Sequence, residues 1–283
     1  MSSSPDSELD DLRRAVDRLD EAMVDLLVER LGAVRAIADI KRRTTTGQPA
    51  IRPGREAVIL RRLVARAGDG FPAGTLVRMW RELLAATTRA QAPLAIAACV
   101  PRDQPELWDI ARDHFGSMAP IQRTEGCSHA LRLVADGAAH LAVLPLPGEL
   151  EPWWAQLVDT TIRPLRVLAK LPFGSATSYP EGSGAYVVGA MEPDPSGADM
   201  SLLAIETTQD VGRARLLAGM GVSSRWLATQ RCPDTGLAQH LIELEGFYSP
   251  REPLATDALP TAYEHVLRST WLGSYARPLP TGN

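Results

Sequence analysis

Lysine is nearly absent from this sequence. Of its 30 basic residues only two are lysines, one of them Lys41, and the others are arginines. Arginine presents a planar fork of donors, whereas lysine presents a compact ammonium, so the two are not interchangeable. A lysine in such an arginine-rich chain indicates a position that requires the compact charge, and Lys41 is therefore a candidate site residue.

Membrane spans, secretion signals and cysteine frameworks are missing as well. No apolar run approaches the length of a membrane span, and the N-terminus MSSSPDSELDD has neither a cationic start nor an apolar core. The cysteines at 99, 127 and 232 are scattered, with no metal-binding spacing. A net charge of −4 gives no reason to expect nucleic acid or an acidic membrane as a partner. We therefore expect a cytoplasmic globular protein without a bound metal.

A long helix is predicted for residues 9–43. The position that follows Leu26 in its apolar pattern is Arg30, and a guanidinium there needs an anionic partner, because an unpaired buried charge is costly. Nearby acids do not obviously supply one, so a bound anion is the candidate. The apolar residues recur at steps of three and four, as on one face of a helix: Leu9, Leu12, Val16, Leu19, Met23, Leu26, Ala33, Ile37 and Ile40.

Helical geometry brings Arg30 and Lys41 to one face. At about 100° per residue they lie within about 20° of each other and about 16 Å apart along the axis. Arg13 is rotated by about 100° from Arg30 and points elsewhere. A helix of about 34 residues is about 50 Å long, too long to bury its apolar face alone. We expect a second copy of the chain to cover it, and Arg13 to serve the partner copy's site.

The pattern changes after residue 93. Two further helices are predicted before it, over 54–67 and 75–91. Beyond it, short apolar runs alternate with helical segments, as in an α/β layer with a parallel sheet. The last part, with a first strand at 185–191 and a second helix at 257–268, has a βαββαβ-like order. The sequence predicts a multidomain protein, all-α and then α/β and α+β, with these domains: 1–93, 94–184 and 185–283.

Residues 8–92 resemble the all-helical chorismate mutase family. The resemblance rests on LRRAVDRLDEAMVDLLVERL (12–31), Lys41, RPGRE (52–56) and TTRAQ (87–91). It implies a three-helix chain that intertwines with a second copy and shares its long first helix between two active sites. It also implies the rearrangement of chorismate to prephenate in phenylalanine and tyrosine biosynthesis, a pericyclic reaction that needs no cofactor.

The resemblance also implies roles for individual side chains. Arg13 of the second copy and Arg30 hold the two substrate carboxylates, to which the guanidinium fork is matched. Lys41 and Gln91 donate to the ether oxygen, where negative charge grows in the transition state. The remaining expectations are that Glu56 accepts from the ring hydroxyl, that Arg55 supports the carboxylate side, and that two residues line the site: Arg52 and Thr87.

Residues 94–283 are similar in part to the dehydratase and ACT portions of bifunctional chorismate mutase–prephenate dehydratases. The segment 94–184 is too short for the two dehydratase lobes. Gly184-Ala185-Tyr186 stands where the family has its catalytic Thr-Arg-Phe, and Pro145-Leu146-Pro147-Gly148 replaces Pro-Glu-Asn-Ser. We therefore expect no dehydratase activity. Gly212 and Arg231 persist from the effector-binding elements of the ACT domain, so phenylalanine or tyrosine is a candidate effector.

Alternative interpretations stay open at this point. Besides a chorismate mutase, the sequence is compatible with a non-catalytic regulatory or partner-docking protein of the aromatic amino-acid pathway, or with an enzyme that is still bifunctional. The C-terminal part can equally be a degenerate remnant that is kept for stability, dimer contacts or a partner surface.

Overall fold

The computed structural model describes residues 5–44, 51–148, 152–158, 164–174, 179–208, 212–231, 236–249 and 266–280. The chain divides into two compact units. The first comprises Met1–Ala50 with Thr87–Pro93, and the second comprises Ile51–Ala86 with Leu94–Asn283.

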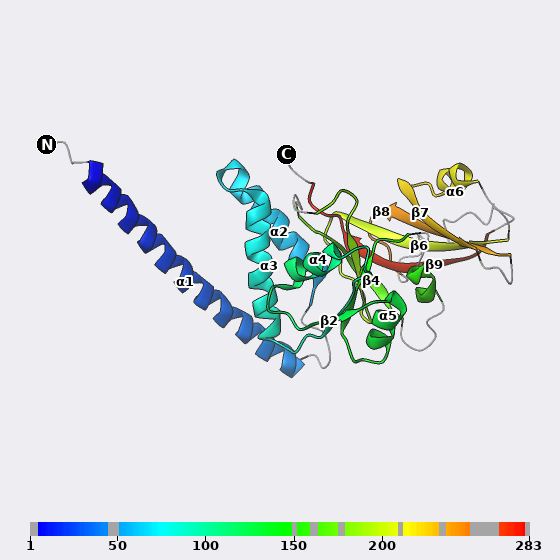
Figure 1. The fold of residues 1–283 in the computed structure, drawn as a ribbon, viewed down its shortest axis with the longest axis horizontal. Coiled ribbons are helices and arrows are strands. Elements are labelled where there is room, and N and C mark those ends of the chain that lie inside the picture. The colour runs from blue at the N-terminus through cyan, green and yellow to red at the C-terminus, as the bar shows by residue number, and fades with distance from the viewer. Residues whose placement is uncertain are drawn as a thin grey trace. The chain divides into compact units, whose positions relative to one another are not determined.

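The first unit is built on α1 (Pro5–Thr44), a helix of 40 residues (Figure 1). The helix begins a few residues before the predicted start, with Pro5 in its first turn, where a missing N–H costs nothing. Its last turn carries Lys41 and two arginines, which interact favourably with the helix dipole. The predicted apolar face lies open in the single chain, with 46–65% of each of these side chains exposed: Leu9, Leu12, Val16, Leu19, Met23, Leu26, Ile37 and Ile40.

Helices α2 (Pro53–Ala67) and α3 (Ala73–Arg89) agree with the predicted second and third helices. A short 3-10 turn, η1 (Gly68–Gly70), separates them. Pro53 opens α2 at a position that suits proline. The two helices contribute Ala57, Leu60 and Val77 to one small apolar cluster.

A single nine-stranded sheet forms the body of the second unit, in the order β2-β1-β3-β5-β4-β9-β6-β8-β7. Its first part is parallel, because β1 pairs with β2 and β3 in the same direction, and the rest is largely antiparallel. The strands are β1 (Ile96–Cys99), β2 (Ile121–Thr124), β3 (Leu141–Pro145), β4 (Arg166–Leu171), β5 (Ala185–Gly189), β6 (Asp199–Thr207), β7 (Ser224–Arg231), β8 (Ala238–Glu245) and β9 (Val266–Ala276).

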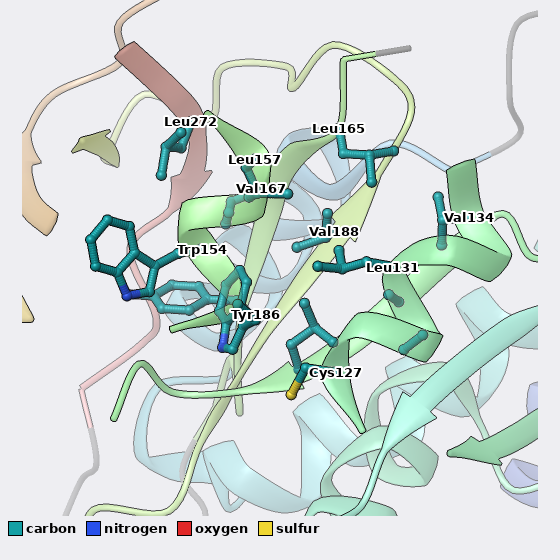
Figure 2. Packing of buried hydrophobic residues seen from close by; sticks show 14 of the residues in the cluster. Cys127, Leu131, Val134, Trp154, Leu157, Leu165, Val167, Tyr186, Val188 and Leu272 are labelled. Carbon is teal, nitrogen blue, oxygen red and sulfur yellow. The ribbon is translucent and has the colours of Figure 1, made fainter. Parts of the chain in front are cut away.

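Strand β1 shows why the first part of the sheet has two covered faces. All four of its residues are buried. Ala97 and Cys99 join the apolar cluster that includes side chains of α5 (Cys127–Ala135) and η2 (Trp153–Leu157), part of which is drawn in Figure 2. Ile96 and Ala98 join the opposite cluster, with α4 (Glu106–Phe115). Continuous burial with alternating faces is typical of a strand between two helical layers.

The sheet continues without a break from the predicted α/β part into the ACT-like part. Strand β4 pairs in parallel with β9 at Val167 and Gly273. Gly273 has φ +143, and a β carbon there would lie 2.2 Å from the carbonyl oxygen of Val167. Only glycine allows this close approach of two backbones.

Two sequence-based expectations were wrong in this region. Strand β5, expected to open the last segment, lies between β3 and β4 and is antiparallel to both, so this part of the sheet is not wholly parallel. The end of the helix expected at 257–268 is strand, since β9 begins at Val266. The rest of that expected helix lies outside the described residues. The first helix of the ACT-like part is α6 (Arg213–Gly219).

Candidate active site

Arg30 and Lys41 lie on one face of α1, as predicted from their spacing. Val34 and Ala38 share this face. Arg30, Val34 and Lys41 are half-buried, and Ala38 is only 7% exposed. The Nη1 atom of Arg30 is buried and has no hydrogen-bond partner among the residues that the structure describes. Burial lowers the pKa of the Arg30 guanidinium. An anion at this face would satisfy a donor that the chain leaves open.

Arg13 lies on a different part of α1 and is well exposed. Its Nη1 atom donates to Asp10 Oδ1 at 3.1 Å, with 67% and 56% of the two side chains exposed. A pair of this kind contributes little to stability. The guanidinium is therefore available to a ligand.

Thr87 and Gln91 sit at the end of α3, in the same unit as α1. Thr87 is 5% exposed. The side-chain Nε2 of Gln91 donates to the Thr87 carbonyl at 3.2 Å, which fixes the direction of the amide. One of the two Nε2 hydrogens serves this bond, so the other can serve a ligand.

The remaining predicted residues lie at the start of α2, in the second unit, with Arg52 just before the helix. Arg52 and Arg55 are both exposed. Asp194, from the segment after β5, accepts hydrogen bonds from the backbone N–H groups of Gly54 and Arg55 at 3.0 and 3.1 Å. Its Oδ2 also lies 3.3 Å from the guanidinium of Arg52. An internal carboxylate thus occupies the N-terminus of α2, a position that favours negative charge.

Glu56 forms an ion pair that the sequence analysis missed. Arg81 of α3 donates from Nη1 to Glu56 Oε2 at 2.7 Å, and only 6% and 17% of the two side chains are exposed. Burial raises the pKa of the Glu56 carboxyl, while the charge and hydrogen bond of Arg81 act against this rise. A signal was present: Arg81 follows Val77 and precedes Leu84 on one helix face, so it interrupts an apolar series as Arg30 does.

The sheet gathers a second polar cluster around Glu243, which the sequence analysis also missed. Glu243 Oε1 accepts from Tyr275, from Lys170 Nζ at 3.2 Å and from Tyr186 at 3.4 Å, and Oε2 accepts from Arg225 at 2.7 and 3.0 Å. Burial opposes the ionisation of Glu243, but these hydrogen bonds and positive charges together outweigh it and lower its pKa. Since all these polar groups have partners, we assign the cluster a structural role, in which it links neighbouring strands of the sheet.

Ala185 and Tyr186 are the first two residues of β5, and Gly184 directly precedes that strand. Ala185 is completely buried on β5, opposite Pro145 and Leu171. The hydroxyl of Tyr186 is buried beside Tyr275 and Glu243. Neither position presents a free nucleophile or acid.

The two candidate effector residues lie in the ACT-like part. Gly212 is exposed at the N-terminus of α6, and Arg231 is exposed at the end of β7. Arg213, next to Gly212, stacks on Trp226 of β7 at 5.5 Å. Helix α6 therefore packs on the strand that ends with Arg231.

Two of the three cysteines lie together, whereas Cys232 lies outside the described residues. The Sγ atoms of Cys99 and Cys127 lie 3.0 Å apart at the start of α5, and both residues are free thiols and fully buried. Among the described residues, no group of three or more His, Cys, Asp or Glu side chains could hold a metal ion. In the same part of the chain, no helix combines the length and the apolar character needed to cross a membrane.

Residues 12–92 match the chorismate mutase type II family. The matched region contains all eight of the predicted catalytic and substrate-binding residues. A wider similarity exists to the bifunctional chorismate mutase/prephenate dehydratase of Pseudomonas aeruginosa, with 26% identity over 147 residues, 51% of this chain and 40% of that protein. The chain thus spans about two fifths of the length of this relative.

Two solved structures are similar at low identity. One is GqqA, described as a novel type of quorum quenching acylase, with a TM-score of 0.47, 16% identity, and coverage of 66% of this chain and 95% of that chain. The other is the prephenate dehydratase of Arthrobacter aurescens in complex with L-Phe, with a TM-score of 0.45, 13% identity, and coverage of 67% and 93%.

Proposed function

We propose that this chain is a chorismate mutase, which rearranges chorismate to prephenate in the biosynthesis of phenylalanine and tyrosine. One observation carries the proposal: the Nη1 atom of Arg30 is buried without a hydrogen-bond partner among the described residues. Arg30 also lies on the same face of α1 as Lys41. Both residues fall within the stretch that matches chorismate mutase type II. Chorismate carries two carboxylates and supplies the anion that this face lacks.

The reaction needs little from the protein beyond shape and fixed charge. Arg30, with Arg13 of a second copy, holds the two carboxylates in the compact conformer, which lowers the entropic part of the barrier. Lys41 and the second Nε2 hydrogen of Gln91 donate to the ether oxygen, where they act most strongly in the transition state. Glu56 accepts from the ring hydroxyl. Arg52, Arg55 and Thr87 line the site, and no cofactor takes part.

A second copy of the chain completes the site in this proposal. The apolar face of α1 is exposed over most of the helix, and an exposed apolar stripe of this length favours pairing with another helix. Arg13 is exposed and bound only to a surface carboxylate, so it can turn toward the partner copy. The protein is then a cytoplasmic homodimer.

The C-terminal part has no dehydratase activity in this proposal. Ala185 is buried in the sheet and carries no hydroxyl, and the Tyr186 hydroxyl is engaged with Glu243 and Tyr275. The ACT-like part is left with a regulatory role, in which phenylalanine or tyrosine binds near Gly212 and Arg231. Titration calorimetry with each amino acid tests this role, and the absence of both heat and any change in rate contradicts it.

A steady-state assay on the full chain tests the proposed activity. The loss of chorismate absorbance is followed, and the product is then examined for prephenate and phenylpyruvate. Loss of chorismate with prephenate as the end point supports a mutase without dehydratase activity. Formation of phenylpyruvate contradicts the absence of dehydratase activity. If chorismate is not consumed, the proposed mutase activity is contradicted.

A further inference from the structure

The ion pair between Glu56 and Arg81 joins two helices inside the second unit. Glu56 is in the first turn of α2 and Arg81 is near the middle of α3. The pair is almost fully shielded from water, so each charge depends on the other. Only Glu56 Oε2 is used, and Oε1 has no hydrogen bond among the described residues, so it can still accept one.

The aromatic ring of Phe173 packs against the Arg81 guanidinium. The guanidinium carbon of Arg81 lies 5.3 Å from the centroid of the Phe173 ring, within the range of a cation–π interaction. Phe173 follows β4, is 5% exposed, and its carbonyl accepts from the backbone N–H of Leu279 at 2.7 Å. The next residue, Gly174, packs so closely on Val77 of α3 that a β carbon would lie 2.8 Å from it. The ring is thus fixed by the C-terminal region.

We propose that Arg81 is a positioning residue for the mutase reaction, which holds the Glu56 carboxylate ready to accept from the substrate hydroxyl, and that Phe173 fixes Arg81. The proposal rests on the proposed function. It also assigns a role to residues 94–283. The contacts from Phe173 through Arg81 to Glu56 start in this C-terminal region and end at a residue of the proposed mutase site.

The charges around Glu56 set the expected pH response. Besides Arg81, the nearby groups are Asp194, which opposes ionisation of Glu56, and Arg52, which is paired with Asp194. Two further groups belong to these surroundings: Arg61, which stacks on the same Phe173 ring, and His114, whose pKa is held well below its ordinary value by burial and by the Arg81 charge. Among these cations, Arg81 alone has its side chain hydrogen-bonded to the Glu56 carboxylate.

Loss of the Arg81 charge should leave Glu56 buried without its counter-ion. The pKa of Glu56 then rises, and at neutral pH the protonated carboxyl accepts the substrate hydroxyl more weakly than the carboxylate does, because the charge-assisted hydrogen bond is lost. The defect should therefore shrink as the pH is raised and Glu56 ionises. A purely structural role of Arg81 predicts instead a loss of activity that does not depend on pH.

The test compares the full chain with R81Q, R81K and the matched control R78Q, whose arginine is also on α3 but is exposed and paired with Asp113. Chorismate mutase kcat/KM is measured from about pH 6 to about pH 9. We expect kcat/KM of R81Q to be at least about tenfold below that of the wild type at pH 7 and to recover much of this loss by pH 9. The kcat/KM values of R81K and R78Q should stay within about threefold of the wild type at every pH. A pH-independent loss in R81Q, or an equal loss in R78Q, overturns the proposal.

Phe173→Leu keeps the inference testable should R81Q fail to fold. It removes the ring and retains an apolar side chain, and we expect a smaller defect with the same pH trend. A pH profile identical to that of the wild type contradicts the role of Phe173. Failure of the wild-type chain to convert chorismate contradicts the proposed function itself, whereas turnover by the wild type with unaltered profiles in both variants contradicts only the role of Arg81.

Discussion

Gly54 and Asp194 lie against each other so closely that no side chain fits at position 54. A β carbon there would be 2.1 Å from the carbonyl oxygen of Asp194. The Asp194 carboxylate accepts the Gly54 backbone N–H at 3.0 Å. This contact joins residues 140 positions apart and fastens the start of α2 to the segment after β5.

Gly54→Ala should destabilise the protein. Alanine favours a helix over glycine by about 1 kcal/mol, but overpacking against a backbone costs about 1–3 kcal/mol, and the clash here is with main-chain atoms. We expect a net loss of about 1 kcal/mol or more in the free energy of unfolding, measured by urea denaturation. Gly70→Ala is the control, because nothing lies within 4 Å of its β-carbon position. Equal effects of the two changes would show that the contact with Asp194 is unimportant.

Arg30→Ala should remove a contact with a substrate carboxylate. Its loss should cost about 2–4 kcal/mol of transition-state binding, visible as a fall in chorismate mutase kcat/KM. Arg35→Ala, an exposed arginine on the same helix, provides the matched control. A loss below about tenfold in Arg30→Ala would falsify the role of this residue.

Leu19→Glu should weaken the dimer. Leu19 is 65% exposed in the single chain and lies in the middle of the apolar face of α1. A glutamate at position 19 that is buried against a second copy of the chain leaves an unpaired negative charge in the interface. Sedimentation velocity over a concentration series should show more monomer for this variant, while Arg18→Glu, a neighbouring exposed position, should match the wild type. A monomeric wild type contradicts the homodimer directly.

Glu243→Gln should destabilise the sheet at neutral pH. Because the folded-state pKa of Glu243 is lowered, its contribution to the free energy of unfolding is present above the ordinary value of 4.5 and is lost as the pH falls through the folded-state value. The glutamine variant should therefore be less stable by about 2 kcal/mol at pH 7 and should approach the wild type in acid. Urea unfolding at both pH values measures the difference.

Glu245→Gln is the control for that experiment. Glu245 lies on the same strand as Glu243, but its partner Arg277 and its own side chain are each about half exposed. Its replacement should leave the stability almost unchanged. A similar loss in both variants, or a loss in Glu243→Gln that persists undiminished in acid, contradicts the importance of the buried cluster.

The sequence by itself determined the local features of this protein. The three helices of residues 1–93 and the strand expected at 185–191 are where apolar periodicity predicted them, because the repeat of a helix or strand is a property of consecutive residues. The common face of Arg30 and Lys41 follows from the same geometry. The predicted domain boundaries and the roles of the site residues stay predictions.

Only the tertiary structure decided which distant segments meet. Three such meetings join residues 14 or more positions apart: the pairing of β5 with β3 and β4, the partnership of Glu56 with Arg81, and the closeness of Cys99 to Cys127. Apolar patterns predict that a segment is buried, but they do not predict which other segment packs against it. Hydrogen bonds of the sheet and the pairing of buried charges are settled by the packing of the whole chain, since each buried polar group must find a partner wherever the fold supplies one.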